Sequence, residues 1–345
     1  MKRKLSIIAT IFAGIVLSGS AVAKLGREFN SRIAFVQRPD IFSMNPDGSD
    51  VRQLTNLGAN NFAFWENWSP DGRQLVFSEF PNNSTVQLWL MNSDGSDQHL
   101  LLSESNYDEH APSFSPDGVW VIFTRCEDPS KGNGCAIYKI RTDGGGLTPV
   151  TDFQGEVGDW EPVYSPDGMT IVFESYSRDG MIVALWLMNA DGSDIRRLTP
   201  PELEAINPHW SPDNEKIAFT THALNPQNTD LWVVNRDGHG LAWLTGSAAH
   251  DFDIPPTYYD RAPSWSPHGD AIVFDQYVPS TNTQAIFVMN ADGSGIRQIM
   301  KLSAATHRVI AQTSAQELQG TMRRHRFPRE IELGGTWARW SPDLQ

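Results

Sequence analysis

The sequence predicts an all-β chain folded as a six-bladed β-propeller of four-stranded antiparallel blades, and three observations support this. A unit of about 46–55 residues recurs along the chain, and each unit contains four short apolar runs separated by turn residues. The last unit is divided between the two ends of the chain. Repeats of this length, with four strands each, are typical of propeller blades.

The first two strands of each unit are marked by an aromatic-Ser-Pro motif. Its aromatic residues are Trp68, Phe114, Tyr164, Trp210, Trp265 and Trp340. Asp-Gly follows in several copies and indicates a turn, because Pro presets φ and Gly tolerates positive φ. In five units a short apolar run ending in Phe comes next, at residues 75–77, 121–123, 171–173, 217–219 and 272–274. We expect these runs to be second strands.

A third apolar run leads into an Asp-Gly turn in each unit. The runs are residues 88–91, 137–140, 185–188, 231–234 and 286–289. Asp-Gly between two apolar runs is a strong hairpin signal, so a fourth strand is expected after each turn, as at residues 195–199.

The two ends of the chain together complete the sixth blade. Residues 33–35, 41–44 and 51–54 match strands two to four of a unit, and residues 336–340 match strand one. Pairing the C-terminal strand with the three N-terminal strands closes the ring and leaves no open sheet edge.

Residues 1–23 have the features of a secretory signal peptide. A basic head at Lys2, Arg3 and Lys4 precedes an apolar stretch, and Ala21-Val22-Ala23 is a small-residue cleavage signal. We therefore expect a periplasmic or secreted protein without a membrane span, in which residues 24–345 form one propeller with a long inserted loop at 300–335.

The acidic composition limits the partners that we expect. The chain has 27 Lys and Arg against 41 Asp and Glu, a formal net charge of −14, and cleavage of the leader makes it more acidic. Such a surface repels nucleic acid and anionic membranes, so we expect neither as a partner, and we expect a monomer.

The two cysteines, Cys126 and Cys135, bracket a polar stretch of eight residues. In an oxidising compartment this spacing favours a disulfide across the mouth of a hairpin loop. Two unpaired thiols are the alternative, whereas two ligands do not complete a metal site.

These motifs resemble the PD-type repeats of the TolB-like propeller family, in which aromatic-Ser-Pro-Asp-Gly, Ile-Ala-Phe and Met-Asn-Ala-Asp-Gly mark each blade. The resemblance covers residues 32–345. TolB itself, in the periplasmic Tol-Pal system, carries an α/β domain ahead of its propeller, and this chain is expected to lack it. The same type of propeller also resembles the one that stands ahead of the hydrolase domain in prolyl peptidases. This sequence has no Gly-x-Ser-x-Gly motif, so serine peptidase chemistry is not supported.

We expect a functional site at the end of the blades opposite the Asp-Gly turns, where the connections are longer and more varied. The candidate ligand-binding residues at the channel mouth are Trp65, Glu66, Glu109, His110, Asp159, Trp160, Glu161, Asp260, Arg261 and Trp337. Carboxylates from several blades suit a divalent cation such as calcium, and Glu109, His110, Asp159 and Glu161 are the proposed metal ligands. The alternative is that they are solvated charges at loop ends.

Other side chains are expected near the same end. His222 and His250 join His110 there, with aromatic rings at Tyr107, Phe252, Tyr258 and Tyr259, whereas His209 is expected inside a strand. The loop at 300–335 contains a cationic cluster of four arginines and one histidine: Arg323, Arg324, His325, Arg326 and Arg329. It either clamps a carboxylate-bearing ligand or partner, or is a solvated loop with a short helix at residues 315–319.

Two functions fit this pattern. The first is a non-catalytic module that binds a protein, a peptide or a glycan, which we favour because no nucleophile or metal motif is recognisable. The second is a metal-assisted hydrolase or lyase for a carbohydrate-type substrate, with its site at the central channel.

Overall fold

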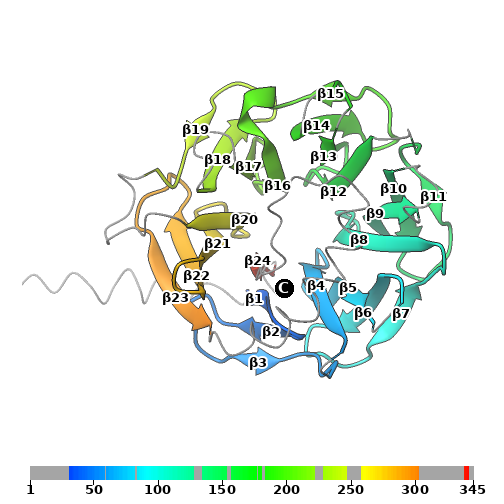
Figure 1. Cartoon of the computed structure of the whole chain (residues 1–345), viewed down its shortest axis with the longest axis horizontal. Coiled ribbons are helices and arrows are strands. Elements are labelled where there is room, and N and C mark those ends of the chain that lie inside the picture. The colour runs from blue at the N-terminus through cyan, green and yellow to red at the C-terminus, as the bar shows by residue number, and fades with distance from the viewer. Residues whose placement is uncertain are drawn as a thin grey trace, which may run out of the picture.

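The computed structural model describes residues 31–58, 60–81, 84–127, 134–153, 157–176, 178–180, 183–221, 228–246, 258–302 and 338–341. Their strands form six blades arranged in a ring around a central axis (Figure 1). The predicted leader, residues 1–23, lies outside the described part. No helix within the described ranges is long and apolar enough to cross a membrane.

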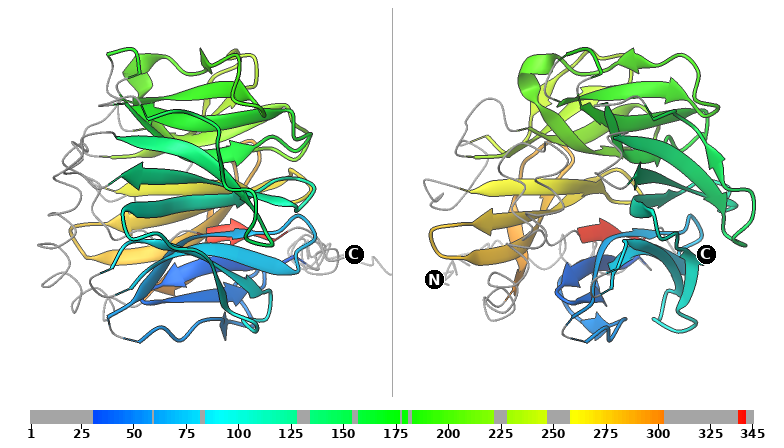
Figure 2. Two further views of the ribbon diagram at one scale, coloured as in Figure 1. Left: turned by 90° about the vertical axis from the view of Figure 1, so that its right-hand side faces the viewer. Right: turned by 45° about the vertical axis from the view of Figure 1, so that its right-hand side comes forward.

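The first blade joins the two ends of the chain, as the sequence predicts. Its strand order is β24 (Ala338–Trp340), β1 (Ile33–Gln37), β2 (Asp40–Met44) and β3 (Arg52–Gln53). Strand β24 pairs antiparallel with β1 over three residues. In Figure 2 the red strand β24 lies beside the blue strands from the N-terminal end of the chain.

The other blades follow in chain order, each beginning with its innermost strand. Blade 2 has β4 (Phe62–Trp68), β5 (Gln74–Phe80), β6 (Gln87–Asn92) and β7 (His99–Leu102), and blade 3 has β8 (Tyr107–Phe114), β9 (Trp120–Glu127), β10 (Cys135–Arg141) and β11 (Thr148–Pro149). Blade 4 has β12 (Gly158–Tyr164), β13 (Thr170–Tyr176), β14 (Val183–Asn189) and β15 (Arg196–Arg197), and after the 3-10 helix η2 (Pro201–Leu203) blade 5 has β16 (Ala205–Trp210), β17 (Lys216–Thr221), β18 (Asp230–Asn235) and β19 (Ala242–Trp243). Blade 6 has β20 (Tyr259–Trp265), β21 (Ala271–Val278), β22 (Thr283–Asn290) and β23 (Arg297–Leu302).

Two details differ from a plain repeat of six sheets. Blades 3 and 4 are joined into one eight-stranded sheet by a parallel bridge between Cys135 and Gly158. The long connection after blade 6 begins later than the predicted residue 300, because β23 pairs with β22 as far as Leu302. Residues 303–337, with the predicted cationic cluster and short helix, lie outside the described part.

The repeated turns are held by their own polar side chains. Ser69 Oγ donates a hydrogen bond to Asp71 Oδ1 at 2.7 Å and accepts one from the backbone N–H of Gln74 at 2.9 Å. Gly95, in the second kind of turn, has φ +85°, and a Cβ there would lie 2.4 Å from the carbonyl oxygen of Leu54 in the preceding blade. Both kinds of turn lie at one end of the blades, which leaves the other end, hereafter the loop face, to the remaining connections.

Each complete inner strand contains a β-bulge, and three of the five bulges are hydrogen-bonded to the preceding blade. The bulges contain residues with positive φ, namely Trp65, Ala111, Glu161, Asn207 and Ala262. Three of their backbone N–H groups donate to side chains on the second strand of the preceding blade, at Thr124, Glu174 and Thr220, over 2.5–3.3 Å. The bulges therefore fix where each inner strand sits beside its neighbour.

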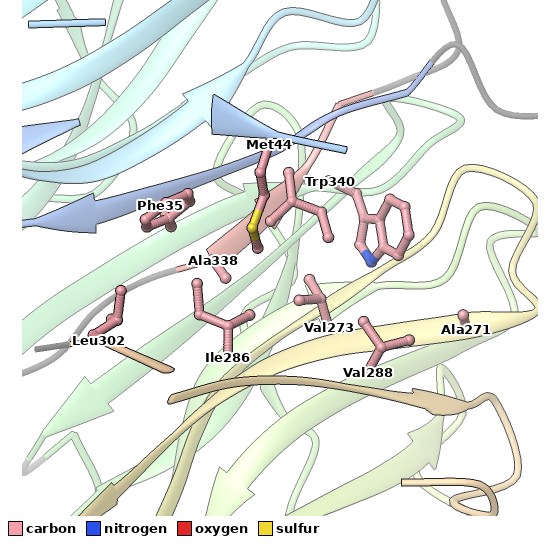
Figure 3. Close-up of a cluster of buried hydrophobic side chains, with 10 residues drawn as sticks. Phe35, Met44, Ala271, Val273, Ile286, Val288, Leu302, Ala338 and Trp340 are labelled. Atoms are coloured by element: carbon pink, nitrogen blue, oxygen red, sulfur yellow. The ribbon is translucent and has the colours of Figure 1, made fainter. Parts of the chain in front are cut away.

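The core lies between the blades. The Phe that ends each second-strand run is fully buried in every blade: Phe35, Phe77, Phe123, Phe173, Phe219 and Phe274. Where the ring closes, Phe35, Met44 and Trp340 of blade 1 pack against Val273 and Ile286 of blade 6 (Figure 3). This apolar contact joins the two ends of the chain to the last complete blade.

Candidate functional site

A cluster of aromatic rings lies toward the loop face of three successive inner strands. Phe64 and Trp65 of β4 have ring centroids 4.6 Å apart, Trp65 lies 5.3 Å from His110 of β8, and His110 lies 5.0 Å from Trp160 of β12. Trp160 is buried, whereas Phe64, Trp65 and His110 are partly exposed. The structure thus brings together three of the predicted site residues and adds Phe64, which the sequence analysis did not single out.

The predicted disulfide is present and packs against this aromatic cluster. Cys126 and Cys135 are bonded with an S–S distance of 2.04 Å. The two sulfurs pack with Trp160, Trp65 and Tyr176. Disulfides persist in oxidising compartments, so this bond indicates a protein that acts outside the cytoplasm.

Glu109 and Asp159 are buried in ion pairs and are not solvated charges at loop ends. Both residues have an exposure of 0%. Arg125 Nη2 lies 2.6 Å from Glu109 Oε1, and Arg178 Nη2 lies 2.5 Å from Asp159 Oδ2. Burial raises the pKa of both carboxyls, that of Glu109 to about 7, while the arginines oppose the shift.

Glu161 and Glu174, both in blade 4, form a carboxyl pair that Asn207 of blade 5 contacts. Asn207 donates through Nδ2 to Glu161 Oε2 at 3.0 Å and through its backbone N–H to Glu174 Oε1 at 2.5 Å. Burial raises the pKa of both carboxyls, and the neighbouring charge of Glu161 raises the pKa of Glu174 further. Both carboxyls therefore hold a proton more strongly than free glutamates do.

Arg339 of β24 is a buried cation with three carboxylates around it. Its Nη1 donates to the carbonyl oxygen of Pro263 at 3.1 Å. Its charge lowers the pKa of Glu66, Glu161 and Asp275, against the larger effect of burial, which raises them. Strand β24 therefore closes the ring and also places the positive charge of Arg339 near these buried acidic groups.

Glu66 is the most isolated of these acids. It is 1% exposed, and neither carboxylate oxygen has a hydrogen-bond partner on another described residue. Burial raises the pKa of Glu66 to about 8. The matching position holds proline in blades 3 to 6, at Pro112, Pro162, Pro208 and Pro263.

Asp260 and Arg261 are adjacent in the chain, but their side chains bind different partners. Asp260 is fully buried, accepts from Gln276 Nε2 at 2.8 Å, and has its pKa raised by burial to about 8. Arg261 pairs through Nη2 with Asp275 Oδ2 at 3.0 Å. Burial raises the pKa of Asp275 to about 6, although Arg261 and Arg339 oppose the shift.

The structure does not gather the proposed metal ligands Glu109, His110, Asp159 and Glu161 into one site. Within the described ranges no group of three or more His, Cys, Asp or Glu side chains is arranged to hold a metal ion. The arginines beside Glu109 and Asp159 take the place of a cation there. Trp337, His222, His250 and Phe252 lie outside the described residues.

The remaining candidates have structural partners. Tyr107 lies under the guanidinium of Arg125, with 4.5 Å from the Arg125 Cζ to the ring centroid, and Tyr258 donates to Asp230 at 3.0 Å. Tyr259 stacks with Tyr277. His209 lies within β16, as predicted, where burial lowers its pKa to about 3.

The sequence analysis missed two buried arginines, two partly buried arginines and two of the acids. Arg38, Arg125, Arg178 and Arg339 look like ordinary surface cations in the sequence. A usable signal is departure from the repeat: where Ser78, Thr124 and Thr220 follow the buried Phe of the second strand, blades 4 and 6 have Glu174 and Asp275.

The sequence of this chain is similar to parts of known bacterial proteins. No family model matches the chain. An uncharacterized protein of Agrobacterium fabrum is 30% identical over 165 residues, 46% of this chain and 52% of that protein. The Tol-Pal system protein TolB of Anaeromyxobacter dehalogenans is 28% identical over 163 residues, 47% of this chain and 35% of TolB.

Solved structures extend the likeness over the whole ring. The crystal structure of TolB from Acinetobacter baumannii matches with a TM-score of 0.66 at 19% identity, over 91% of this chain and 67% of TolB. At this identity the match concerns the fold. The sequence matches, by contrast, span about half or less of the length of the curated relatives. The repeat motifs and the closed ring show a six-bladed β-propeller, and the structural match shows that its fold is similar to that of TolB.

Proposed function

We propose that this protein is a non-catalytic binding module that acts in the periplasm or outside the cell and holds a protein, a peptide or a glycan at its loop face. The observation that carries the proposal is the aromatic cluster of Phe64, Trp65, His110 and Trp160. Aromatic rings provide large apolar surfaces with defined faces, which stack on sugar rings and pack against peptide side chains.

The position of these rings on rigid strands supports a binding role. Its rings come from the inner strands of three blades, and the Cys126–Cys135 disulfide packs beneath them. A site that is rigid before binding loses less conformational entropy when the ligand arrives. The partial exposure of Phe64, Trp65 and His110 leaves ring surface available at the loop face.

The similarity to TolB agrees with this assignment. TolB is named as a protein of the Tol-Pal system. A binding propeller outside the cytoplasm is the corresponding role for this chain. The disulfide and the predicted leader support that location.

Selection of ligands from a random peptide library and from a glycan array tests the proposal. Ligands should bind the unmodified protein and lose affinity by about thirtyfold or more with Trp65→Ala, because a central Trp typically contributes about 2 kcal/mol or more to binding. Trp243→Ala is the matched control, since Trp243 is 48% exposed on the outer strand β19. The proposal fails if neither collection yields a ligand, or if the selected ligands bind Trp65→Ala unchanged.

A further inference from the structure

A second group of aromatic rings lies in blade 3, apart from the cluster around Trp65. Tyr107 is in β8, Tyr138 is in β10, and Phe153 follows β11, and these three are hereafter the blade 3 rings. The ring centroid of Phe153 lies 6.5 Å from that of Tyr107 and 5.9 Å from that of Tyr138. All three rings are partly exposed. Tyr107 and His110 share β8, but their side chains leave opposite faces of the strand, because successive side chains alternate.

The chain itself shows that these rings hold a guanidinium group. The Arg125 Cζ lies 4.5 Å from the ring centroid of Tyr107 and 4.9 Å from that of Tyr138. Planar guanidinium groups stack on aromatic faces, where the ring quadrupole attracts the positive charge. The charge of Arg125 is balanced within the blade, because its Nε donates to both carboxylate oxygens of Glu109 at 3.1 Å and its Nη2 lies 2.6 Å from Glu109 Oε1.

This arrangement is particular to blade 3 and is not part of the repeat. Arg125 stands two positions after the buried Phe of the second strand. The equivalent residues of the other blades are Gln37, Glu79, Ser175, Thr221 and Gln276. Five blades therefore fold without a cation at this position, so the propeller scaffold does not require an arginine among these rings.

Three further carboxyl groups border the blade 3 rings. Glu104 Oε2 lies 3.5 Å from Arg125 Nη1, and the Glu104 side chain is 41% exposed. Glu127 is partly exposed and lies directly opposite Tyr107 where β9 pairs with β8. Asp152 is exposed and immediately precedes the third ring in the chain. Since Arg125 already has a buried carboxylate as its partner, these three groups leave the surface around the rings negative.

We propose that the blade 3 rings, with Glu104, Glu127 and Asp152 around them, form a docking site for an arginine side chain of a partner protein. The rings offer apolar faces to a planar guanidinium, as they do to Arg125, and the carboxylates offer acceptors to its N–H groups. A lysine ammonium is compact and more strongly hydrated, so the site favours arginine. The net charge of −14 on the chain also attracts a basic partner and repels an acidic one.

Binding of a labelled peptide of alternating glycine and arginine tests the docking site, with lysine and glutamate peptides of the same length for comparison. The measurement is made at about 0.15 M salt, where long-range attraction to the acidic chain is largely screened. The arginine peptide should bind the unmodified protein, the lysine peptide should bind more weakly, and the glutamate peptide should not bind.

Substitutions of Phe153 show whether an aromatic face is recognised. Phe153→Leu keeps an apolar side chain but removes the ring, and it should weaken binding of the arginine peptide by about fivefold or more, because the cation–π attraction is lost. Phe153→Trp should bind the peptide at least as tightly as the unmodified protein, since indole is the strongest cation–π partner. A purely structural role for Phe153 does not give this order of affinities.

Asp152→Asn and Glu215→Gln are a matched pair, because each removes one exposed negative charge. Glu215 lies in the turn between β16 and β17, at the end of the blades opposite the loop face. Asp152→Asn should weaken binding of the arginine peptide by about threefold, the size typical of an exposed ion pair. Glu215→Gln should leave the affinity unchanged.

The outcomes separate this inference from the proposed function. Failure of the arginine peptide to bind, equal affinity for the lysine peptide, unchanged affinity with Phe153→Leu, or equal effects of Asp152→Asn and Glu215→Gln would each overturn the docking site. Trp65→Ala should leave binding of the arginine peptide intact, and Phe153→Leu should leave binding of ligands selected for the aromatic cluster intact. Either site can therefore fail while the other stands.

Discussion

Replacing Arg339 by methionine should destabilise the closed ring in a way that depends on pH. Arg339 is 9% exposed and lies near the carboxyl groups of Glu66, Glu161 and Asp275. Removing one partner from a buried charge cluster typically costs about 3–5 kcal/mol, because the remaining charges are left uncompensated. We expect a loss of this size in the free energy of unfolding at pH 8.5.

The loss should become smaller in acid, and the sign follows from the direction of the pKa shifts. Burial raises the pKa of Glu66 to about 8 and that of Asp275 to about 6, so these groups bind more protons in the folded state than in the unfolded state. Their ionisation in the folded protein costs stability as the pH rises, and Arg339 offsets part of this cost. At pH 5 both are largely protonated, and the loss should shrink to about 1–2 kcal/mol, the value of the hydrogen bond to Pro263 and its lost packing.

Urea unfolding followed by tryptophan fluorescence at pH 5, 7 and 8.5 measures this effect. Arg236→Met is the matched control, because Arg236 pairs with Asp167 at the surface with both side chains 36% exposed, and it should cost at most about 1 kcal/mol. Adding Glu66→Gln to Arg339→Met should recover stability at pH 8.5, since an amide does not ionise. An equal loss at pH 5 and pH 8.5 would refute the role of Arg339 as a balancing charge.

Two further predictions concern the disulfide and a turn. Replacing Cys126 and Cys135 by serine should lower the free energy of unfolding by about 2.5 kcal/mol from loop-closure entropy, and should weaken ligand binding at the aromatic cluster above it. Thermal unfolding and affinity measurements check both effects, and unchanged binding would contradict the supporting role of the disulfide. Gly95→Ala should destabilise the protein more than Gly58→Ala, because both glycines have positive φ but only a Cβ at position 95 meets a backbone carbonyl, at 2.4 Å. Equal losses in denaturant unfolding would show that the contact with Leu54 is relieved without cost.

The candidate site was predictable only in part. Trp65, His110 and Trp160 lie together in the structure, and the aromatic-Ser-Pro register gives their position along equivalent inner strands. The partners of Glu109 and Asp159 were not predictable, since each carboxylate meets an arginine whose position depends on how the strands pair. The register of β8 on β9 brings Glu109 opposite Arg125, and a sequence gives no direct measure of that contact.

The sequence by itself determined the number of blades, the closure of the ring and the pairing of the two cysteines. Those features depend on strands and turns that short sequence patterns mark, such as the apolar run Leu75 to Phe77 and the turn at Asp94-Gly95. Only the tertiary structure decided which charges are buried and which meet. Arg38 and Arg261 are separated by most of the chain but lie on neighbouring blades, because closing the ring with β24 brings its first and last units together.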